Sequence, residues 1–274
     1  MGGSLCTLPG AAFLAIPFVL LGNSAYSNIF WLFVFFKTVE SFLKDRFLTL
    51  LLLWVMLLFS PVVLQQIVTG NSELSNALYF FVFTFFLVKL VPQSDTPGWV
   101  KWIVAISFGI SLSSRANFLL LLPVIFSALA QKAGLKSTVP FMLLSCLAFL
   151  VITVPFYLYD PSGFSALHSQ FHKVAQFQSL LPFLGVLIPL GGGLLALGLS
   201  FRRMDFFDFV NLFTNCAFVL SFSIVCVTVL STIQTGELNF SWTGYGIFFL
   251  FFGAVASWSH LVKDRIDPVP KIPN

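Results

Sequence analysis

The stretch from Trp99 to Pro123, WVKWIVAISFGISLSSRANFLLLLP, places Arg115 in a polar break between two apolar runs, Trp99 to Leu112 and Phe118 to Ala130. At about 1.5 Å per residue the first run makes roughly 21 Å of helix, against a hydrocarbon core of about 30 Å. We therefore expect both runs to be too short to cross a bilayer, and Arg115 to lie below the outer membrane surface. A charge at that depth is costly unless it faces water, a carboxylate or a phosphate, so Arg115 indicates a polar site.

The composition of the chain is that of a membrane protein. Hydrophobic residues make up 58% of the 274 residues and charged residues 9%, compared with about 25% charged residues in soluble domains. At about 20 residues per span, we predict an all-α, polytopic transmembrane bundle of about eight to ten helices, with residues 1–274 as a single domain. The net charge of +4 does not indicate nucleic-acid binding, because the basic residues are scattered over loops.

Apolar runs predict the positions of the helices. These runs are Ala11 to Leu21, Ser27 to Leu43, Phe47 to Val68, Leu74 to Val91, Trp99 to Leu112, Phe118 to Ala130, Val139 to Tyr159, Leu180 to Leu199, Phe209 to Ile233 and Trp242 to Val262. The first run is only marginally long, so a re-entrant half-helix is an alternative for it.

The basic residues predict the orientation of the bundle. Of the 14 Lys and Arg residues, Lys37 lies within a run, and only Arg115 and Lys173 fall on one side if the runs alternate in direction. The positive-inside rule assigns the other side to the cytoplasm. We therefore predict an integral membrane protein with a cytoplasmic C-terminus and with Arg115 in an extracytoplasmic connection.

Residues 160–179 form the longest predicted extracytoplasmic loop. Asp160 precedes a proline, which is typical of a turn. Apolar residues then recur three and four apart, which predicts an amphipathic helix at the outer interface. His168 and His172 can share a face of that helix, but no nearby acid or cysteine completes a metal site, so we expect them to face solvent or lipid headgroups.

Glu73 lies in a polar turn that opens a predicted helix. A carboxylate in the first turn of a helix stabilises the helix dipole, which is the simpler explanation for this residue. The alternative is that Glu73, Asn71 and Asn76 line a polar pocket together with Arg115.

Four motifs follow one another between residues 8 and 175. They are LPGAA at 8–12, SPVV at 60–63 leading to GNSE at 70–73, SRANF at 114–118 followed by LLLLP at 119–123, and PF at 155–156 with DP at 160–161. In this order and spacing the chain resembles the GT-C superfamily of membrane glycosyltransferases.

The resemblance implies a transferase that uses a polyprenyl-phosphate-linked sugar on the extracytoplasmic face, in a bacterial inner membrane. It implies no particular cofactor. In such families an acidic residue in the first extracytoplasmic loop usually acts as the general base, but this chain has no acid before Glu40. The family's first helices and acidic loop therefore have no counterpart here, so the chain is expected to be either a truncated form or an inactive relative, and its status as an enzyme stays open.

The resemblance also implies that Arg115 contacts the donor phosphate, since a guanidinium matches phosphate oxygens in a bidentate manner. Glu73 is the candidate catalytic base, because it is the acid on the proposed pocket wall, and Asn71 faces sugar or acceptor hydroxyls. The remaining candidate substrate-binding residues are Asn76, Asn117, Asp160, His168 and His172.

Two other functions fit the composition. A multi-spanning transporter is one, although neither half of the chain repeats the other and charges within the apolar runs are scarce. A non-catalytic, lipid-binding membrane subunit is the other, and it agrees with the missing acidic loop.

Overall fold

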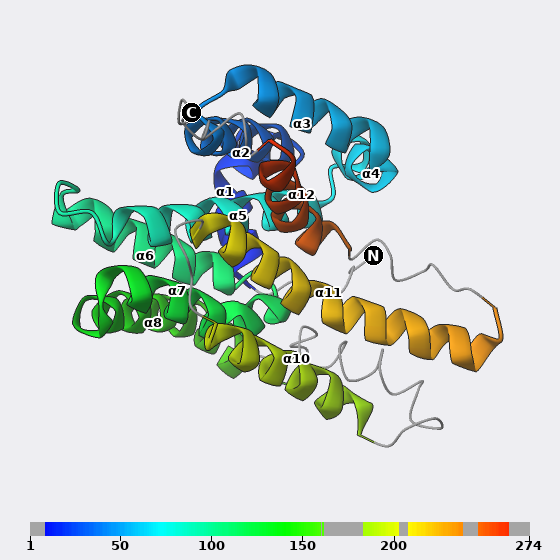
Figure 1. Ribbon diagram of the computed structural model, residues 1–274. Coiled ribbons are helices and arrows are strands. Elements are labelled where there is room, and N and C mark those ends of the chain that lie inside the picture. The colour runs from blue at the N-terminus through cyan, green and yellow to red at the C-terminus, as the bar shows by residue number, and fades with distance from the viewer. Residues whose placement is uncertain (1–8, 160, 162–182, 203–207, 238–245, 263–274) are drawn as a thin grey trace, which may run out of the picture.

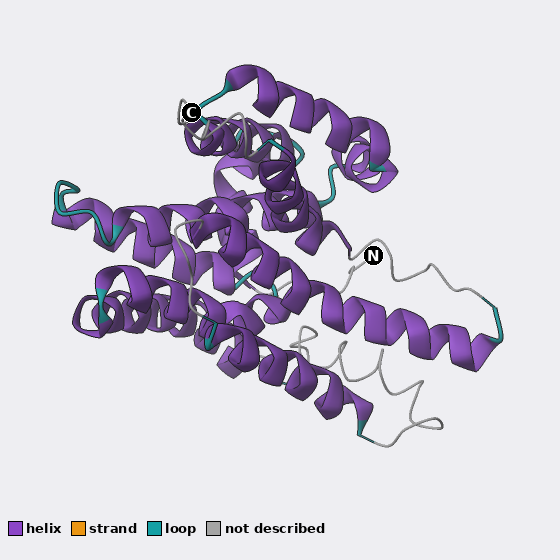
Figure 2. Ribbon diagram, viewed as in Figure 1, coloured by secondary structure: helices purple, strands orange, loops and turns teal. Residues whose placement is uncertain are grey.

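The computed structural model describes residues 9–159, 161, 183–202, 208–237 and 246–262, and in these ranges the secondary structure is entirely helical (Figures 1 and 2). The helices are α1 (Pro9–Leu20), α2 (Tyr26–Leu43), α3 (Arg46–Phe59), α4 (Pro61–Thr69), α5 (Ser72–Leu90), α6 (Gly98–Leu112), the 3-10 helix η1 (Ala116–Leu121), α7 (Leu122–Ala133), α8 (Leu135–Tyr159), α10 (Leu184–Ser200), α11 (Asp208–Thr235) and α12 (Ile247–Leu261). The all-α prediction is confirmed for this part of the chain. The predicted interfacial helix lies outside the described residues.

Four of the described helical segments are long and apolar enough to cross a membrane: α5, η1 with α7, α8, and α11 from Phe209. The bent pair of α3 and α4 is a fifth candidate, and α1, α6, α10 and α12 are apolar but shorter. These lengths support an integral membrane protein. They support the predicted eight to ten spans only in part.

The expectation that both runs around Arg115 are too short is wrong for the second run. The helix begins at Ala116 as the six-residue η1 and continues directly into the 12-residue α7. A 3-10 helix rises about 2.0 Å per residue, so η1 and α7 together reach roughly 30 Å. Only α6, with 15 residues, stays short.

The apolar run from Phe47 to Val68 predicted one helix, but the structure has two. The run bends by 85° between α3 and α4. Ser60, at the bend, has φ −122° and ψ 85°, outside the helical region, because Pro61 clashes with a helical conformation of the residue before it. The helix restarts with Pro61 at its first position, where no backbone N–H is needed.

Helix α1 begins next to the Arg115 break. The Gly10 N–H donates to the Ser113 carbonyl at 2.7 Å. Beyond the other end of α1, Ala25 lies directly against Gly70, which closes α4. With 12 residues, or about 18 Å, α1 is shorter than a hydrocarbon core of about 30 Å, which agrees with the alternative of a re-entrant half-helix.

The core is built around α5, which packs against α2, α6 and α12. Phenylalanines fill it: the rings of Phe80 and Phe118 stack at 3.9 Å, and Phe252 packs on Phe80 and Phe81. Phe118 is fully buried in η1. The core thus anchors the residues that immediately follow Arg115 and fixes the position of the break.

Candidate functional site

Arg115 lies in extended conformation between α6 and η1, with φ −149° and ψ 132°. Two serines shape this break: the Ser114 hydroxyl donates to the Ser111 carbonyl at 2.6 Å, and the Ser113 hydroxyl lies 2.8 Å from that of Thr153 on α8. Helix α8 continues for six residues beyond Thr153, to Tyr159, which adds about 9 Å. The Arg115 break is therefore level with a point about 9 Å before the end of α8.

Arg115 forms an ion pair with Glu73. Arg115 Nη2 lies 3.0 Å from Glu73 Oε1, and the two side chains are 12% and 16% exposed. The guanidinium carbon lies 5.1 Å from the ring centroid of Phe248, in the first turn of α12. A cation over an aromatic face gains about 0.5–2 kcal/mol, so α12 as well as α5 holds Arg115 in place.

Glu73 is engaged through both carboxylate oxygens. Its Oε2 accepts from Gln66 Nε2 on α4 at 3.3 Å, while Oε1 faces Arg115. Its own N–H donates to the Asn71 side chain at 3.2 Å, which caps α5. Glu73 therefore serves the helix N-terminus and the ion pair together, so the two explanations offered by the sequence are compatible.

Asn28 of α2 connects the surrounding backbone. Its Nδ2 donates to the carbonyls of Gln66 at 3.1 Å and Asn71 at 3.0 Å. Its Oδ1 accepts from the Ser75 N–H at 3.2 Å. One buried amide thus satisfies three backbone groups at the ends of α4 and α5.

Tyr79 extends the polar network into the helix bundle. Its hydroxyl donates to Asn76 Oδ1 at 2.5 Å and also interacts with the Ser114 side chain. We call the connected set the Arg115 cluster; it consists of Asn28, Gln66, Asn71, Glu73, Asn76, Tyr79, Ser114 and Arg115.

Three buried polar atoms of the Arg115 cluster have no hydrogen-bond partner among the described residues. They are Arg115 Nε, Asn76 Nδ2 and Gln66 Oε1. An unsatisfied buried polar group costs about 1–3 kcal/mol, more when it is charged. Two donors and one acceptor of the Arg115 cluster are therefore left without a partner among the described residues.

The structure brings together four of the predicted site residues: Asn71, Glu73, Asn76 and Arg115. Asn117 is half-buried in η1, and its side chain makes no hydrogen bond within the described part of the chain. The remaining predicted residues, Asp160, His168 and His172, lie outside the described residues. No three His, Cys, Asp or Glu side chains in the described ranges gather in a group that could hold a metal ion.

Four residues at the site were not predicted from the sequence: Asn28, Gln66, Tyr79 and Phe248. Asn28 and Gln66 are polar residues inside otherwise apolar runs, and that position was the available signal. Phe248 is one phenylalanine among 36 in the chain, so its contact with Arg115 has no sequence signal.

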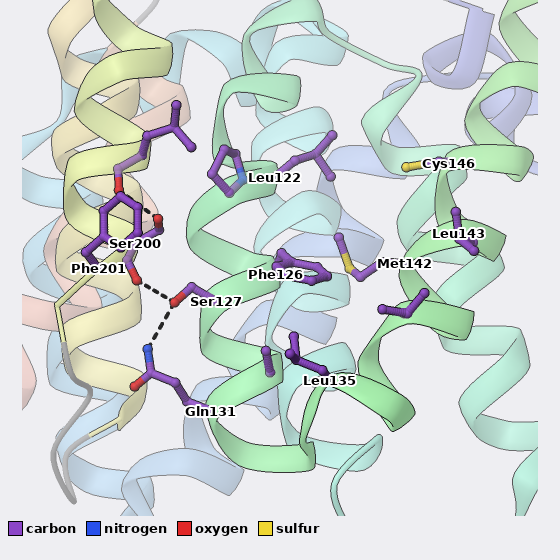
Figure 3. Close-up of a pocket in the computed structure, with 14 residues that line it drawn as sticks. Leu122, Phe126, Ser127, Gln131, Leu135, Met142, Leu143, Cys146, Ser200 and Phe201 are labelled. Carbon is purple, nitrogen blue, oxygen red and sulfur yellow. Dashed lines mark hydrogen bonds between the residues drawn. The ribbon is translucent and has the colours of Figure 1, made fainter.

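A cavity of about 670 Å³ lies elsewhere, between α7, α8 and α10 (Figure 3). No residue of the Arg115 cluster lines it. The Arg115 cluster itself is a hydrogen-bonded network, and a pocket lined by Asn71, Glu73, Asn76 and Arg115 stays a prediction.

Comparisons with protein families, with curated proteins and with solved structures found no match to this chain.

Proposed function

We propose that the Arg115 cluster binds the phosphate of a polyprenyl-phosphate-linked sugar on the extracytoplasmic face, as in a glycosyltransferase-like membrane protein. The observation that carries the proposal is the buried Arg115 Nε, which has no hydrogen-bond partner in the described part of the chain. A guanidinium offers adjacent N–H donors in a fixed plane, and phosphate oxygens are the acceptors that match them.

The other unpartnered atoms suit the same ligand. Among the described residues, Asn76 Nδ2 is a second donor without a partner, and Gln66 Oε1 is an acceptor without one. A phosphate accepts hydrogen bonds only, whereas a sugar hydroxyl also donates. The two donors and one acceptor without partners therefore agree with a phosphate that carries a hydroxylated group.

Glu73 competes with the proposed ligand, because it occupies Arg115 Nη2. In the proposal the ion pair is the resting state: the carboxylate holds the buried guanidinium until the phosphate arrives. Removal of the Glu73 charge then strengthens phosphate binding, whereas a purely structural ion pair makes no such prediction.

A second candidate is a lipid-binding subunit without catalysis, which the state of Glu73 favours. A general base must be within reach of the proton that it abstracts, and both Glu73 oxygens already accept hydrogen bonds from Gln66 and Arg115. Phosphate binding without sugar transfer is the behaviour that this candidate predicts.

Binding of undecaprenyl phosphate to the purified chain in detergent micelles tests the proposal. We expect Arg115→Ala to weaken binding at least tenfold, and Arg115→Lys to weaken it less, because a lysine keeps the charge but not the planar fork. Lys37→Ala is the matched control, since Lys37 is an exposed cation paired with Glu40 at 2.7 Å. Unchanged binding by a folded Arg115→Ala variant would overturn the assignment.

Glu73→Gln separates the ligand role from a structural one. It keeps the size of the side chain and removes its charge, so we expect tighter binding of undecaprenyl phosphate. Equal losses of affinity in Glu73→Gln and Arg115→Ala contradict the proposal. Release of sugar from undecaprenyl-phosphate glucose separates a transferase from a subunit, and solute flux in proteoliposomes free of lipid-linked sugar would instead indicate a transporter.

A further inference from the structure

The cavity between α7, α8 and α10 is an open groove on the side of the bundle. Its volume of about 670 Å³ is within the range of about 300–1,000 Å³ that is typical of small-molecule sites. Its rim is exposed: Leu143 is 64%, Leu197 46% and Phe201 85% accessible. In a membrane these apolar rims face lipid, so a hydrocarbon chain can enter the groove sideways.

The length of the groove matches one leaflet of a bilayer. It follows α7 from Leu122 to Gln131, and nine residues at 1.5 Å make about 14 Å. Half of a hydrocarbon core of about 30 Å is about 15 Å. An acyl chain of a single leaflet is therefore long enough to fill it from end to end.

Polar groups gather at one end of the groove (Figure 3). The Ser127 hydroxyl donates to the Ser200 carbonyl at 2.5 Å, and Gln131 Nε2 donates to Ser127 Oγ at 3.0 Å and to the Arg202 carbonyl at 3.3 Å. Toward the other end, which Leu122 and Cys146 mark, the lining is apolar. A groove with one polar end and one apolar end matches a membrane lipid, which has a polar headgroup and an apolar tail.

Positive charge flanks the polar end. Lys136 follows Leu135 in α8, and Arg202 follows Phe201 after α10; both cations are exposed, and both of their neighbours line the groove. Within 132–136 and 201–208 the sequence has four cations and two acids; they are Lys132, Lys136, Arg202, Arg203, Asp205 and Asp208. The excess of positive charge favours an anionic headgroup.

We propose that this groove holds one acyl chain of an anionic phospholipid, with the headgroup phosphate between Lys136 and Arg202. The site is independent of the Arg115 cluster, since Arg115 precedes η1 and the polar end of the groove lies at the far end of α7.

Native mass spectrometry of the full chain, with phosphatidylglycerol or phosphatidylcholine added in equal amounts, tests the proposal. We expect a retained phosphatidylglycerol that phosphatidylcholine does not replace. Leu143→Trp narrows the groove and should abolish this adduct. Lys136→Gln combined with Arg202→Gln should lower retention more than tenfold, because each cation near a lipid surface contributes about 1 kcal/mol, or about fivefold.

Matched controls exist for both variants. Leu147→Trp adds the same ring one turn further along α8, at an exposed residue that does not line the groove. Lys44→Gln with Arg46→Gln removes two exposed cations next to α3, away from α7 and α8 in Figure 1. Equal retention in Leu143→Trp and Leu147→Trp, or in the two charge variants, overturns the proposal, and so does equal retention of the two lipids. If the Leu143→Trp variant does not fold, lipid retention in the two charge variants still tests the proposal.

Discussion

Asn28 shows how much a single amide contributes to the candidate site. It is 1% exposed, and its three hydrogen bonds reach backbone groups of Gln66, Asn71 and Ser75. No apolar side chain can replace these bonds. The turn between α4 and α5, and with it the placement of Glu73, therefore depends on a residue from a helix that is distant in sequence.

We expect Asn28→Ala to lower the free energy of unfolding by about 2–4 kcal/mol, because two carbonyls and one N–H lose their partner in a buried site. Asn23→Ala is the control, since Asn23 makes a single exposed bond to the Ala25 N–H and should change stability by less than about 1 kcal/mol. Unfolding in detergent, followed by circular dichroism, measures both. Similar losses in the two variants would contradict the role given to Asn28.

The Arg115–Glu73 pair is suited to a double-mutant cycle. Each single alanine variant leaves a largely buried charge unpaired, whereas the double variant leaves none, so the two losses of stability should not add. We expect a coupling free energy of about 1–3 kcal/mol from thermal unfolding of the four proteins. A coupling near zero would mean that solvent already screens the pair, contrary to its low exposure.

At the scale of helices, α6 and α8 pack at very short range through Gly109. A Cβ at that residue would collide with the Ser145 carbonyl oxygen. Because this is a backbone atom, it can move only if α8 itself shifts. The Ser145 hydroxyl in turn donates to the Ala105 carbonyl at 2.8 Å. Small residues at a helix interface permit such close backbone approach within membranes.

Gly109→Ala should therefore lower the melting temperature, with an overpacking cost of about 1–3 kcal/mol. Gly193→Ala is the matched control in the middle of α10, where a Cβ would have no neighbouring atom within 4 Å. There we expect no loss, and at most a gain of about 1 kcal/mol from helix propensity. Thermal unfolding of both variants in the same detergent decides; a tolerated Gly109→Ala would rule out the tight packing of α6 on α8.

The boundaries of helices were predictable where they depend on local chemistry. The runs from Ser27, Leu74 and Phe209 correspond closely to α2, α5 and α11. The bend at Ser60 was missed although Pro61 is a local signal, because the apolar composition continues across it. The run from Phe118 to Ala130 covers most of η1 and α7, but it was predicted too short, because Asn117 looks like a loop residue, whereas packing of Phe118 on Phe80 holds the start of the helix.

At the scale of the whole molecule, the sequence predicted which side chains lie close together. It predicted less well which contacts hold them there. Arg115 and Glu73 were placed on neighbouring connections by the alternation of charge, and they form an ion pair. The contact of Phe248 with Arg115 could not be predicted, since Phe248 comes from a distant segment with no distinguishing motif, and the polar position of Asn28 inside an apolar run did not reveal its partners. Charge patterns act over whole connections, whereas hydrogen bonds and ring contacts depend on the final packing.

The distribution of cations makes a prediction about the whole bundle. Lys44 lies close enough to Lys89 to interact with it electrostatically, and Lys101 donates to the carbonyls of Val91 and Gln93. These lysines thus gather at the end of the bundle opposite Arg115. The positive-inside rule then predicts that this end faces the cytoplasm.

Cysteine labelling measures this orientation, in a background where the four native cysteines are replaced by alanine. Single cysteines at Ser94 and Ser137 report the lysine-rich end, and those at Asn23 and Glu237 report the Arg115 end; all four residues are exposed. In right-side-out vesicles we expect a membrane-impermeant maleimide to label Asn23→Cys and Glu237→Cys, and to label Ser94→Cys and Ser137→Cys only after permeabilisation. The reverse pattern would put the Arg115 cluster on the cytoplasmic face, where an extracytoplasmic sugar donor cannot reach it, whereas labelling of all four from one side would contradict a bundle that crosses the membrane.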